Sequence, residues 1–246
     1  MRYRLTIATA DTIGRGIFGF RVDVRGRRHL PHDVAGQPAG GWIAAGSPHR
    51  TWVDPFVVAT ALPVDPRLVF FGDGPAIFRS AWRRWLVRQV GGVIPIWPGG
   101  DRQAIEGYLA AATAALRAGA VLCLFPETGP PTPAGTVRPF GSGLAYFALR
   151  TGAPVVPMVL GGTDELYRGR HFRLEILEPV TWQWLAGVEP GSEPPEPWSS
   201  AERRIAHRIT RALHELTAPA VERTHLASLP PAGIRKRWTW LTGAWH

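Results

Sequence analysis

The sequence predicts an α/β fold with a mixed, largely parallel sheet flanked by helices. Between residues 41 and 159, short β-prone runs alternate with amphipathic helical segments, which is the pattern of βαβ units. The β-prone runs lack strict apolar–polar alternation, as is typical of strands buried on both faces. The length of 246 residues suits one domain with a substantial core.

Five strands are expected, each at a short apolar run. In chain order they lie at residues 42–45, 68–71, 93–97, 120–125 and 155–160. A helix that spans a membrane needs about 20 apolar residues in sequence. The apolar runs of this chain are far shorter, so we expect no membrane span.

Two helices carry clear signals at their ends. Asp101 is a suitable N-cap for a helix that stops at Gly119. A capping box of Ser199 and Glu202 predicts the start of a second helix, which we expect to pack on the outside of the sheet. Residues 187–197 are rich in Pro, Gly and Glu and are expected to form a loop.

The composition excludes several classes of protein. With 45% hydrophobic and 19% charged residues, the chain is neither disordered nor fibrous. Asp11 and Arg15 interrupt the place where a secretory signal would need its apolar stretch, so we expect a cytoplasmic location. Cys123 is the single cysteine and is expected to be part of the core, with no disulfide.

A formal net charge of +9 indicates an anionic partner, which could be nucleic acid, an anionic lipid surface or a phosphorylated substrate. The chain has 11 tryptophans, a residue enriched at the membrane–water interface. Several lie beside arginines, and no recognised RNA- or DNA-binding motif is present. We therefore expect an anionic membrane surface rather than nucleic acid.

Residues 77–90 and the C-terminal run 235–245 are both basic and aromatic. A basic amphipathic helix with tryptophan on its apolar face is typical of segments that lie in the membrane interface. In the alternative interpretation the first segment packs on the sheet with its arginines in water, and the second docks back onto the domain.

A histidine and an aspartate share the connection that follows the strand at 42–45. Asp54 precedes Pro55 and fits a helix N-cap, which leaves His49 in the preceding loop. A carboxylate bonded to one imidazole nitrogen fixes the tautomer and frees the other nitrogen to act as a general base. The alternative is an aspartate cap beside an unrelated exposed histidine.

Glu127 ends a Phe-Pro-Glu run that directly follows the apolar strand at 120–125. Ligands of open parallel sheets bind at the carboxyl ends of the strands, and both Glu127 and His49 are expected there. No nucleophile elbow surrounds Ser142, and nucleotide-binding and zinc motifs are missing. These absences favour direct attack by the hydroxyl of a substrate, and we expect no cofactor.

Four segments resemble, in order and spacing, the four blocks of the lysophosphatidate (1-acylglycerol-phosphate) acyltransferase family. They are the His49-x4-Asp54 motif, Gly-Val-Ile-Pro-Ile at 92–96, Phe-Pro-Glu at 125–127 and Val-Val-Pro at 155–157. The resemblance covers roughly residues 20 to 180. It implies a glycerolipid-acyltransferase-like fold, with His49 as general base, Asp54 orienting it, and Glu127 helping to bind the acceptor.

The resemblance also implies an activity, its substrates and its place. Members of this family transfer an acyl group from acyl-CoA or acyl-carrier protein to a hydroxyl of a membrane lipid, without a metal or a covalent enzyme intermediate. The implied acceptor is of the lysophosphatidate type. Such an enzyme would lie on the inner face of the cytoplasmic membrane as a peripheral protein.

The chain departs from the family where phosphate is bound. The third block usually continues Gly-Thr-Arg-Ser, whereas Thr128 and Gly129 are followed here by two prolines, and the second block also lacks its arginine. Arg102 or Arg138 could supply the missing contacts. Arg50 or backbone amides could stabilise the oxyanion, and Thr128 and Gly129 are expected beside the substrate.

Two alternatives follow from these departures. The same chemistry could act on a phosphate-free lipid or glycolipid, or the chain could be a catalytically inert, lipid-binding relative. Both share the expected organisation, in which residues 1–225 form a single acyltransferase domain and residues 226–246 form a basic, aromatic tail.

Overall fold

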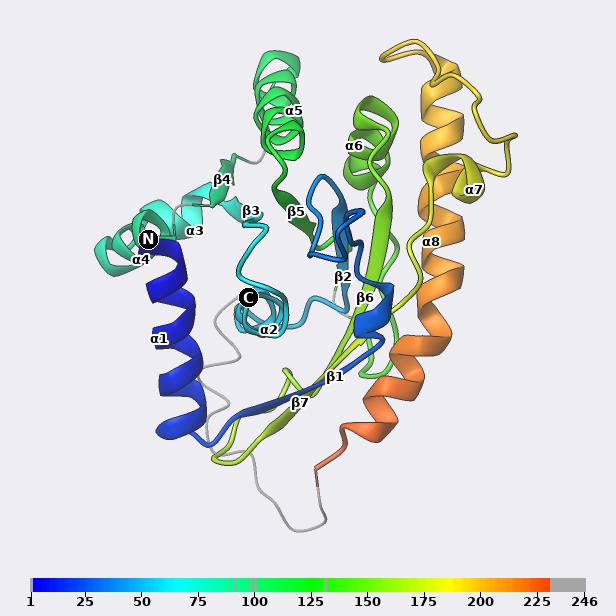
Figure 1. Cartoon of the computed structure of the whole chain (residues 1–246). Coiled ribbons are helices and arrows are strands. Elements are labelled where there is room, and N and C mark those ends of the chain that lie inside the picture. The colour runs from blue at the N-terminus through cyan, green and yellow to red at the C-terminus, as the bar shows by residue number, and fades with distance from the viewer. Residues whose placement is uncertain (1, 91, 98, 100, 131, 231–246) are drawn as a thin grey trace.

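A computed structural model of the chain describes residues 2–90, 92–97, 99, 101–130 and 132–230 (Figure 1). Most of the predicted C-terminal tail, including the basic aromatic run at 235–245, lies outside these residues. Among the described residues, no helix is both long and apolar enough to cross a membrane.

The described residues form one mixed sheet of seven strands in the order β1-β7-β6-β2-β5-β3-β4. The strands are β1 (Arg21–Arg25), β2 (Ile43–Ser47), β3 (Leu68–Asp73), β4 (Val93–Ile96), β5 (Val121–Leu124), β6 (Val155–Gly161) and β7 (His171–Ile176). Every neighbouring pair is parallel except β6 with β7, which is antiparallel. The predicted fold class is therefore confirmed.

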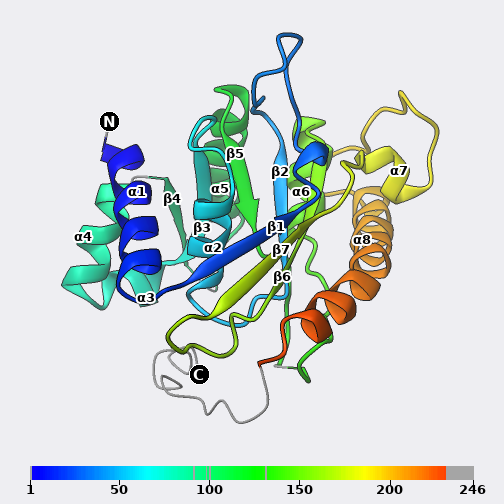
Figure 2. The same ribbon diagram turned by 60° about the horizontal axis from the view of Figure 1, so that its bottom comes forward.

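The five predicted strands are all present as β2 to β6, whereas the sequence did not predict β1 and β7. These two strands pair with each other in parallel, and Figure 2 shows them side by side at one edge of the sheet. Their side chains alternate between more exposed and more buried positions, unlike the continuously buried strands at the centre. In β1, Arg21, Asp23 and Arg25 take the exposed positions, so no apolar run marks it.

Helices cover both faces of the sheet (Figure 1). On one face, α1 (Arg2–Gly16) and α2 (Asp54–Ala61) contribute to a core with Ala44, Cys123 and Val156. The other face carries α5 (Arg102–Arg117), α6 (Gly143–Thr151), α7 (Trp182–Ala186) and α8 (Ser200–Ala227). Neighbours along one strand face opposite cores, which explains why these strands lack an apolar–polar alternation.

The two predicted helices begin at their predicted caps. The Asp101 side chain accepts a hydrogen bond from the Ala104 amide at 2.9 Å, and α5 follows it. The Ser199 hydroxyl accepts a bond from the Glu202 amide at 3.0 Å, and α8 then packs on β6. The loop predicted at 187–197 contains no helix or strand.

The predicted basic aromatic helix at 77–90 is two helices, α3 (Gly74–Phe78) and α4 (Ala81–Val90). Trp85 is 62% exposed and does not pack on the sheet. The side chains of Trp82 and Leu86 lie outside the described part of the chain. α4 contacts α1, so this segment flanks the α1–α2 face of the domain.

Candidate active site

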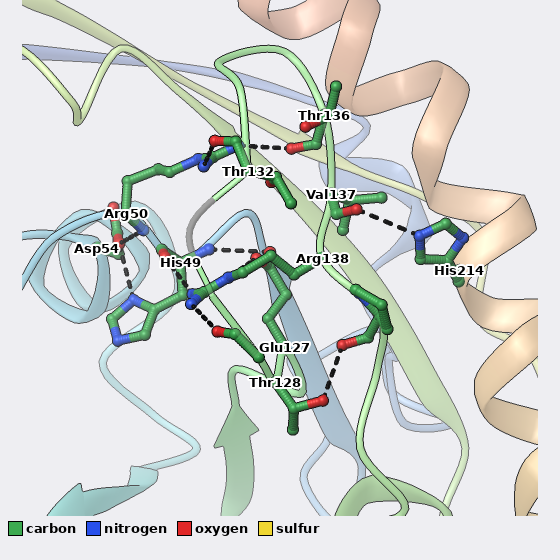
Figure 3. A network of polar contacts seen from close by, with 12 residues as sticks. His49, Arg50, Asp54, Glu127, Thr128, Thr132, Thr136, Val137, Arg138 and His214 are labelled. Atoms are coloured by element: carbon green, nitrogen blue, oxygen red, sulfur yellow. Dashed lines mark hydrogen bonds and ion pairs between the residues drawn. The ribbon is translucent and has the colours of Figure 1, made fainter.

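The predicted catalytic residues, His49 and Asp54, directly follow the central strand β2. β2 lies between β6 and β5 and ends at Ser47, and α2 begins at Asp54. The connection between them carries His49 at the carboxyl edge of the parallel strands, where side chains from different segments converge (Figure 3).

His49 and Asp54 form the predicted pair. His49 Nδ1 lies 2.8 Å from Asp54 Oδ2, and the Asp54 side chain is 0% exposed. The same oxygen accepts the amide N–H groups of Arg50 at 2.7 Å and Thr51 at 2.8 Å. An ionised carboxylate only accepts hydrogen bonds, so Nδ1 carries the proton and Nε2 keeps a lone pair.

The prediction that Asp54 caps the helix is wrong. α2 begins at Asp54 itself, the N-cap position is Val53, and no side chain caps the helix there. The Asp54 carboxylate turns back onto the preceding loop because three N–H groups of that loop surround it.

The His49 ring is held on a second side by Phe125. The two rings stack with centroids 4.3 Å apart and planes 24° apart. The His49 side chain is 35% exposed, and Nε2 has no hydrogen-bond partner among the described residues. The imidazole is therefore fixed at Nδ1 and on its face while Nε2 can receive a proton.

Phe125 needs the glycine at position 46 to reach this place. A Cβ atom on Gly46 would lie 2.6 Å from Cε1 of the Phe125 ring, which no real contact allows. Phe125 opens the Phe-Pro-Glu run, yet the sequence assigned it no role. Phe125 directly follows the apolar strand β5, which neighbours β2 in the sheet. This position was the one indication that Phe125 could lie beside His49.

Glu127 is within this network, and its side chain is buried (0% exposed). Oε1 accepts the His49 amide at 3.0 Å, and Oε2 accepts Arg138 Nε at 2.8 Å. Both oxygens are thus bonded inside the protein, where Glu127 joins the loop that carries His49 to Arg138.

Arg138 and Arg50 are also bonded to the protein. Arg138 donates to the carbonyls of His49 at 2.8 Å and Gly129 at 3.2 Å. Arg50 donates to three carbonyls of the proline-rich loop, those of Thr132, Pro133 and Thr136, at 2.8, 3.0 and 2.6 Å. Each of these two guanidinium groups thus makes three hydrogen bonds within the protein.

Thr128 and Gly129 lie in the same network, whereas Arg102 does not. The amide and hydroxyl of Thr128 both donate to the Pro139 carbonyl, at 2.9 and 3.2 Å. Arg102, on the first turn of α5, pairs with Glu106 at 2.8 Å and stacks over the Trp198 ring at 5.2 Å. The structure thus does not bring Arg102 to His49.

An apolar cavity of about 350 Å³ opens beside the loop that carries His49. Trp52 and Val53 of that loop line it together with side chains of α1, α2, β1 and β7. The sequence did not predict this cavity because two of its walls belong to the strands that the sequence did not reveal.

Other groups that could react do not reach this site. Cys123 is buried in β5, and burial raises the pKa of its thiol far above the usual range, so it is not a thiolate nucleophile. Over the described residues, no three His, Cys, Asp or Glu side chains gather in a way that could hold a metal ion.

In this α/β domain, a buried carboxylate is bonded to a part-exposed imidazole at the carboxyl edge of a largely parallel sheet, an arrangement suited to general-base chemistry. The chain belongs to the acyltransferase family, whose model matches residues 21–161. This match confirms the family resemblance inferred from the sequence.

Two similar proteins carry related descriptions. A 1-acyl-sn-glycerol-3-phosphate acyltransferase of Cocos nucifera is 34% identical over 86 residues, which are 35% of this chain and 27% of the coconut protein. The chain thus matches about a quarter of that relative's length. The crystal structure of the 1-acyl-sn-glycerophosphate (LPA) acyltransferase PlsC from Thermotoga maritima has a TM-score of 0.57 at 20% identity, covering 90% of this chain and 81% of that one. This likeness supports the fold.

Substitution of Gly46 by alanine should displace Phe125 and with it the His49 ring. Overpacking of this kind destabilises by about 1–3 kcal/mol. Misplacing the base should lower acyl transfer by up to about 100-fold. Thermal unfolding and a turnover assay would measure both effects. Gly107→Ala is the control, because nothing lies within 4 Å of the added Cβ in α5. Wild-type turnover in Gly46→Ala would show that Phe125 does not hold the ring.

Proposed function

We propose that this protein is an O-acyltransferase that moves a fatty acyl group from a thioester donor, acyl-CoA or acyl-carrier protein, to a hydroxyl of a membrane lipid. The proposed acceptor is of the lysophosphatidate type, as the descriptions of both similar proteins suggest. The observation that carries the proposal is the His49 imidazole, which is bonded to Asp54 through Nδ1 and leaves Nε2 available.

The chemistry needs one base and no protein nucleophile. His49 Nε2 takes the proton of the acceptor hydroxyl as its oxygen attacks the thioester carbonyl. The tetrahedral intermediate expels the thiolate of the donor, the carbon–sulfur bond breaks, and the imidazolium returns the proton to that sulfur. The Asp54 carboxylate stabilises the imidazolium between these steps.

The apolar cavity is a suitable place for the acyl chain of the donor. It reaches the catalytic loop at Trp52 and Val53, close along the chain to His49. Phe18, Phe20 and Phe172 are among its other walls. Each buried methylene contributes about 0.8 kcal/mol, so such a cavity favours long chains up to the length that it holds.

The acceptor head group has a second candidate. Arg50 and Arg138 direct their N–H groups at main-chain carbonyls, and Arg102 is bound elsewhere. A phosphate-free lipid or glycolipid acceptor therefore fits these contacts as well as lysophosphatidate does. The assembled His49–Asp54 pair favours an active enzyme over an inert lipid-binding relative.

We further propose that the α3–α4 segment docks the enzyme on the inner face of the cytoplasmic membrane. Phe78 and Trp85 of this segment are exposed, and Phe78 stacks on the exposed Trp97, which follows β4, with ring centroids 5.5 Å apart. Arg84 and Arg88 are exposed on α4, the helix that also carries Trp85. α4 contacts α1, which lines the cavity, so the docking surface would lie near the place where lipid must enter.

Removal of the base tests the reaction. With purified protein, His49→Ala should reduce thiol release from acyl-CoA by about 10²- to 10⁴-fold, because it removes the positioned base. His171→Ala, which alters an exposed histidine on β7, should leave turnover unchanged. The acceptor panel should include lysophosphatidate, a glycolipid and a hydroxylated phosphate-free lipid. Equal turnover of His49→Ala and wild type would remove His49 from this role.

Filling the cavity tests where the acyl chain lies. Gly14 lines the cavity, and a Cβ there meets only Phe20 within 4 Å, at 3.9 Å. Gly14→Phe should therefore shift the preferred donor to shorter chains in a series of acyl-CoA lengths. Gly16→Phe on the same helix should not, since Gly16 does not line the cavity. An unchanged length preference in Gly14→Phe would place the acyl chain elsewhere.

Liposome sedimentation tests the docking surface. Trp85→Ala should weaken retention on anionic vesicles, because the side chain is 62% exposed on a basic helix. Trp184→Ala removes a 60% exposed tryptophan from α7, far along the chain, and should bind like wild type. If duplex DNA or RNA were preferred over the vesicles, the basic charge would serve nucleic acid instead.

A further inference from the structure

The main chain of His49 is held by a closed ring of hydrogen bonds. Its N–H donates to Glu127 Oε1 at 3.0 Å, and its carbonyl accepts Arg138 Nη2 at 2.8 Å. Arg138 Nε closes the ring by donating to Glu127 Oε2 at 2.8 Å. Figure 3 shows the three residues drawn together from different segments of the chain.

The ring is built from an ion pair that is largely removed from water. The Glu127 side chain is 0% exposed and that of Arg138 is 18% exposed. Charge-assisted hydrogen bonds are shorter and stronger than neutral ones, and low exposure strengthens them further. One ion pair thus satisfies both the donor and the acceptor of the His49 peptide groups.

The ring complements what Asp54 does. Asp54 fixes the imidazole at Nδ1 and also binds the amides of Arg50 and Thr51. Those contacts hold the later part of the loop and the tip of the side chain. The Glu127–Arg138 pair holds the main chain of His49, so the base is fixed at both ends.

We propose that Glu127 and Arg138 form a clamp that positions the general base His49, and that Arg138 acts on the reaction through His49 rather than by binding the acceptor. This inference rests on the proposed acyl-transfer function. Gly129 supplies a further carbonyl to Arg138 at 3.2 Å, which ties the proline-rich loop to the same clamp.

The chain offers a closely matched control for the clamp. Arg150 and Glu202 form another ion pair at 2.8 Å, with side chains 24% and 1% exposed. No contact joins this pair to His49 in the described part of the chain. Arg138→Gln and Arg150→Gln should therefore lower the unfolding midpoint comparably, whereas only Arg138→Gln alters the base.

Steady-state kinetics on the folded variants gives the first test. Arg138→Gln should lower kcat by about 10- to 100-fold through misplacement of His49, with KM for lysophosphatidate unchanged. Arg138→Lys should not rescue kcat, because one ammonium cannot reproduce the geometry of the fork. Arg150→Gln should keep the wild-type kcat. A raised KM confined to phosphate-bearing acceptors, with kcat unchanged, would overturn the clamp and make Arg138 a phosphate contact.

A proton NMR measurement tests the clamp without turnover. The Nδ1–H proton bonded to Asp54 should give a downfield resonance, assigned by its loss in His49→Ala. It should broaden or vanish in Arg138→Gln and in the milder Glu127→Gln, and persist in Arg150→Gln. An unchanged resonance in both clamp variants would overturn the proposal. A clamp-dependent resonance in an enzyme that releases no thiol with any donor would reject the acyl-transfer function and leave the clamp standing.

Discussion

The arrangement of the site depends on one buried carboxylate oxygen, Oδ2 of Asp54. A charge removed from water must be matched by donors, and this oxygen receives three of them, from His49 Nδ1 and the amides of Arg50 and Thr51. The loop therefore wraps around it. The second oxygen, Oδ1, is also buried and has no hydrogen-bond partner among the described residues.

The sheet supports this loop because its centre is covered on both sides. β2 is fully buried and pairs in parallel with β5 on one side and β6 on the other. These contacts hold the end of the strand in place. The loops that follow β2 and β5 must then meet at one edge. The Glu127 loop reaches the His49 loop for that reason. One arginine from each loop donates hydrogen bonds to main-chain carbonyls of the other loop. Arg50 extends outward to the proline-rich loop, and Arg138 extends back to His49.

Much of this could be predicted from the sequence. Strands buried on both faces are continuous apolar runs, and the caps at Asp101 and Ser199 mark helix starts, so β2 to β6, α5 and α8 were identifiable. The His49–Asp54 pair was accessible because both residues share one short connection.

The rest depends on contacts between distant segments. β1 and β7 are far apart in the sequence but pair in the sheet, with Asp23 opposite Arg173. Neither strand has an apolar run. The contacts of Arg50, Arg138 and Glu127 could not be predicted for a different reason. A residue type shows which bonds a side chain can make, but not that main-chain carbonyls and amides have already taken them. Proline has no backbone N–H, so a proline-rich loop has few main-chain donors for its own carbonyls. Arg50 donates to three carbonyls of this loop instead.

The cavity and the catalytic loop are encoded in largely separate parts of the chain. The loop and its clamp come from residues 47–54 and 125–138, whereas most cavity walls come from the first 22 residues, from α2, and from Leu166 and Phe172. Substitutions in these walls can reshape the space without touching the proton-transferring groups. If the cavity holds the acyl chain, as proposed, the tolerated chain length could drift within one lineage while the reaction stayed constant. Such an enzyme could follow changes in membrane lipid composition without evolving its chemistry anew.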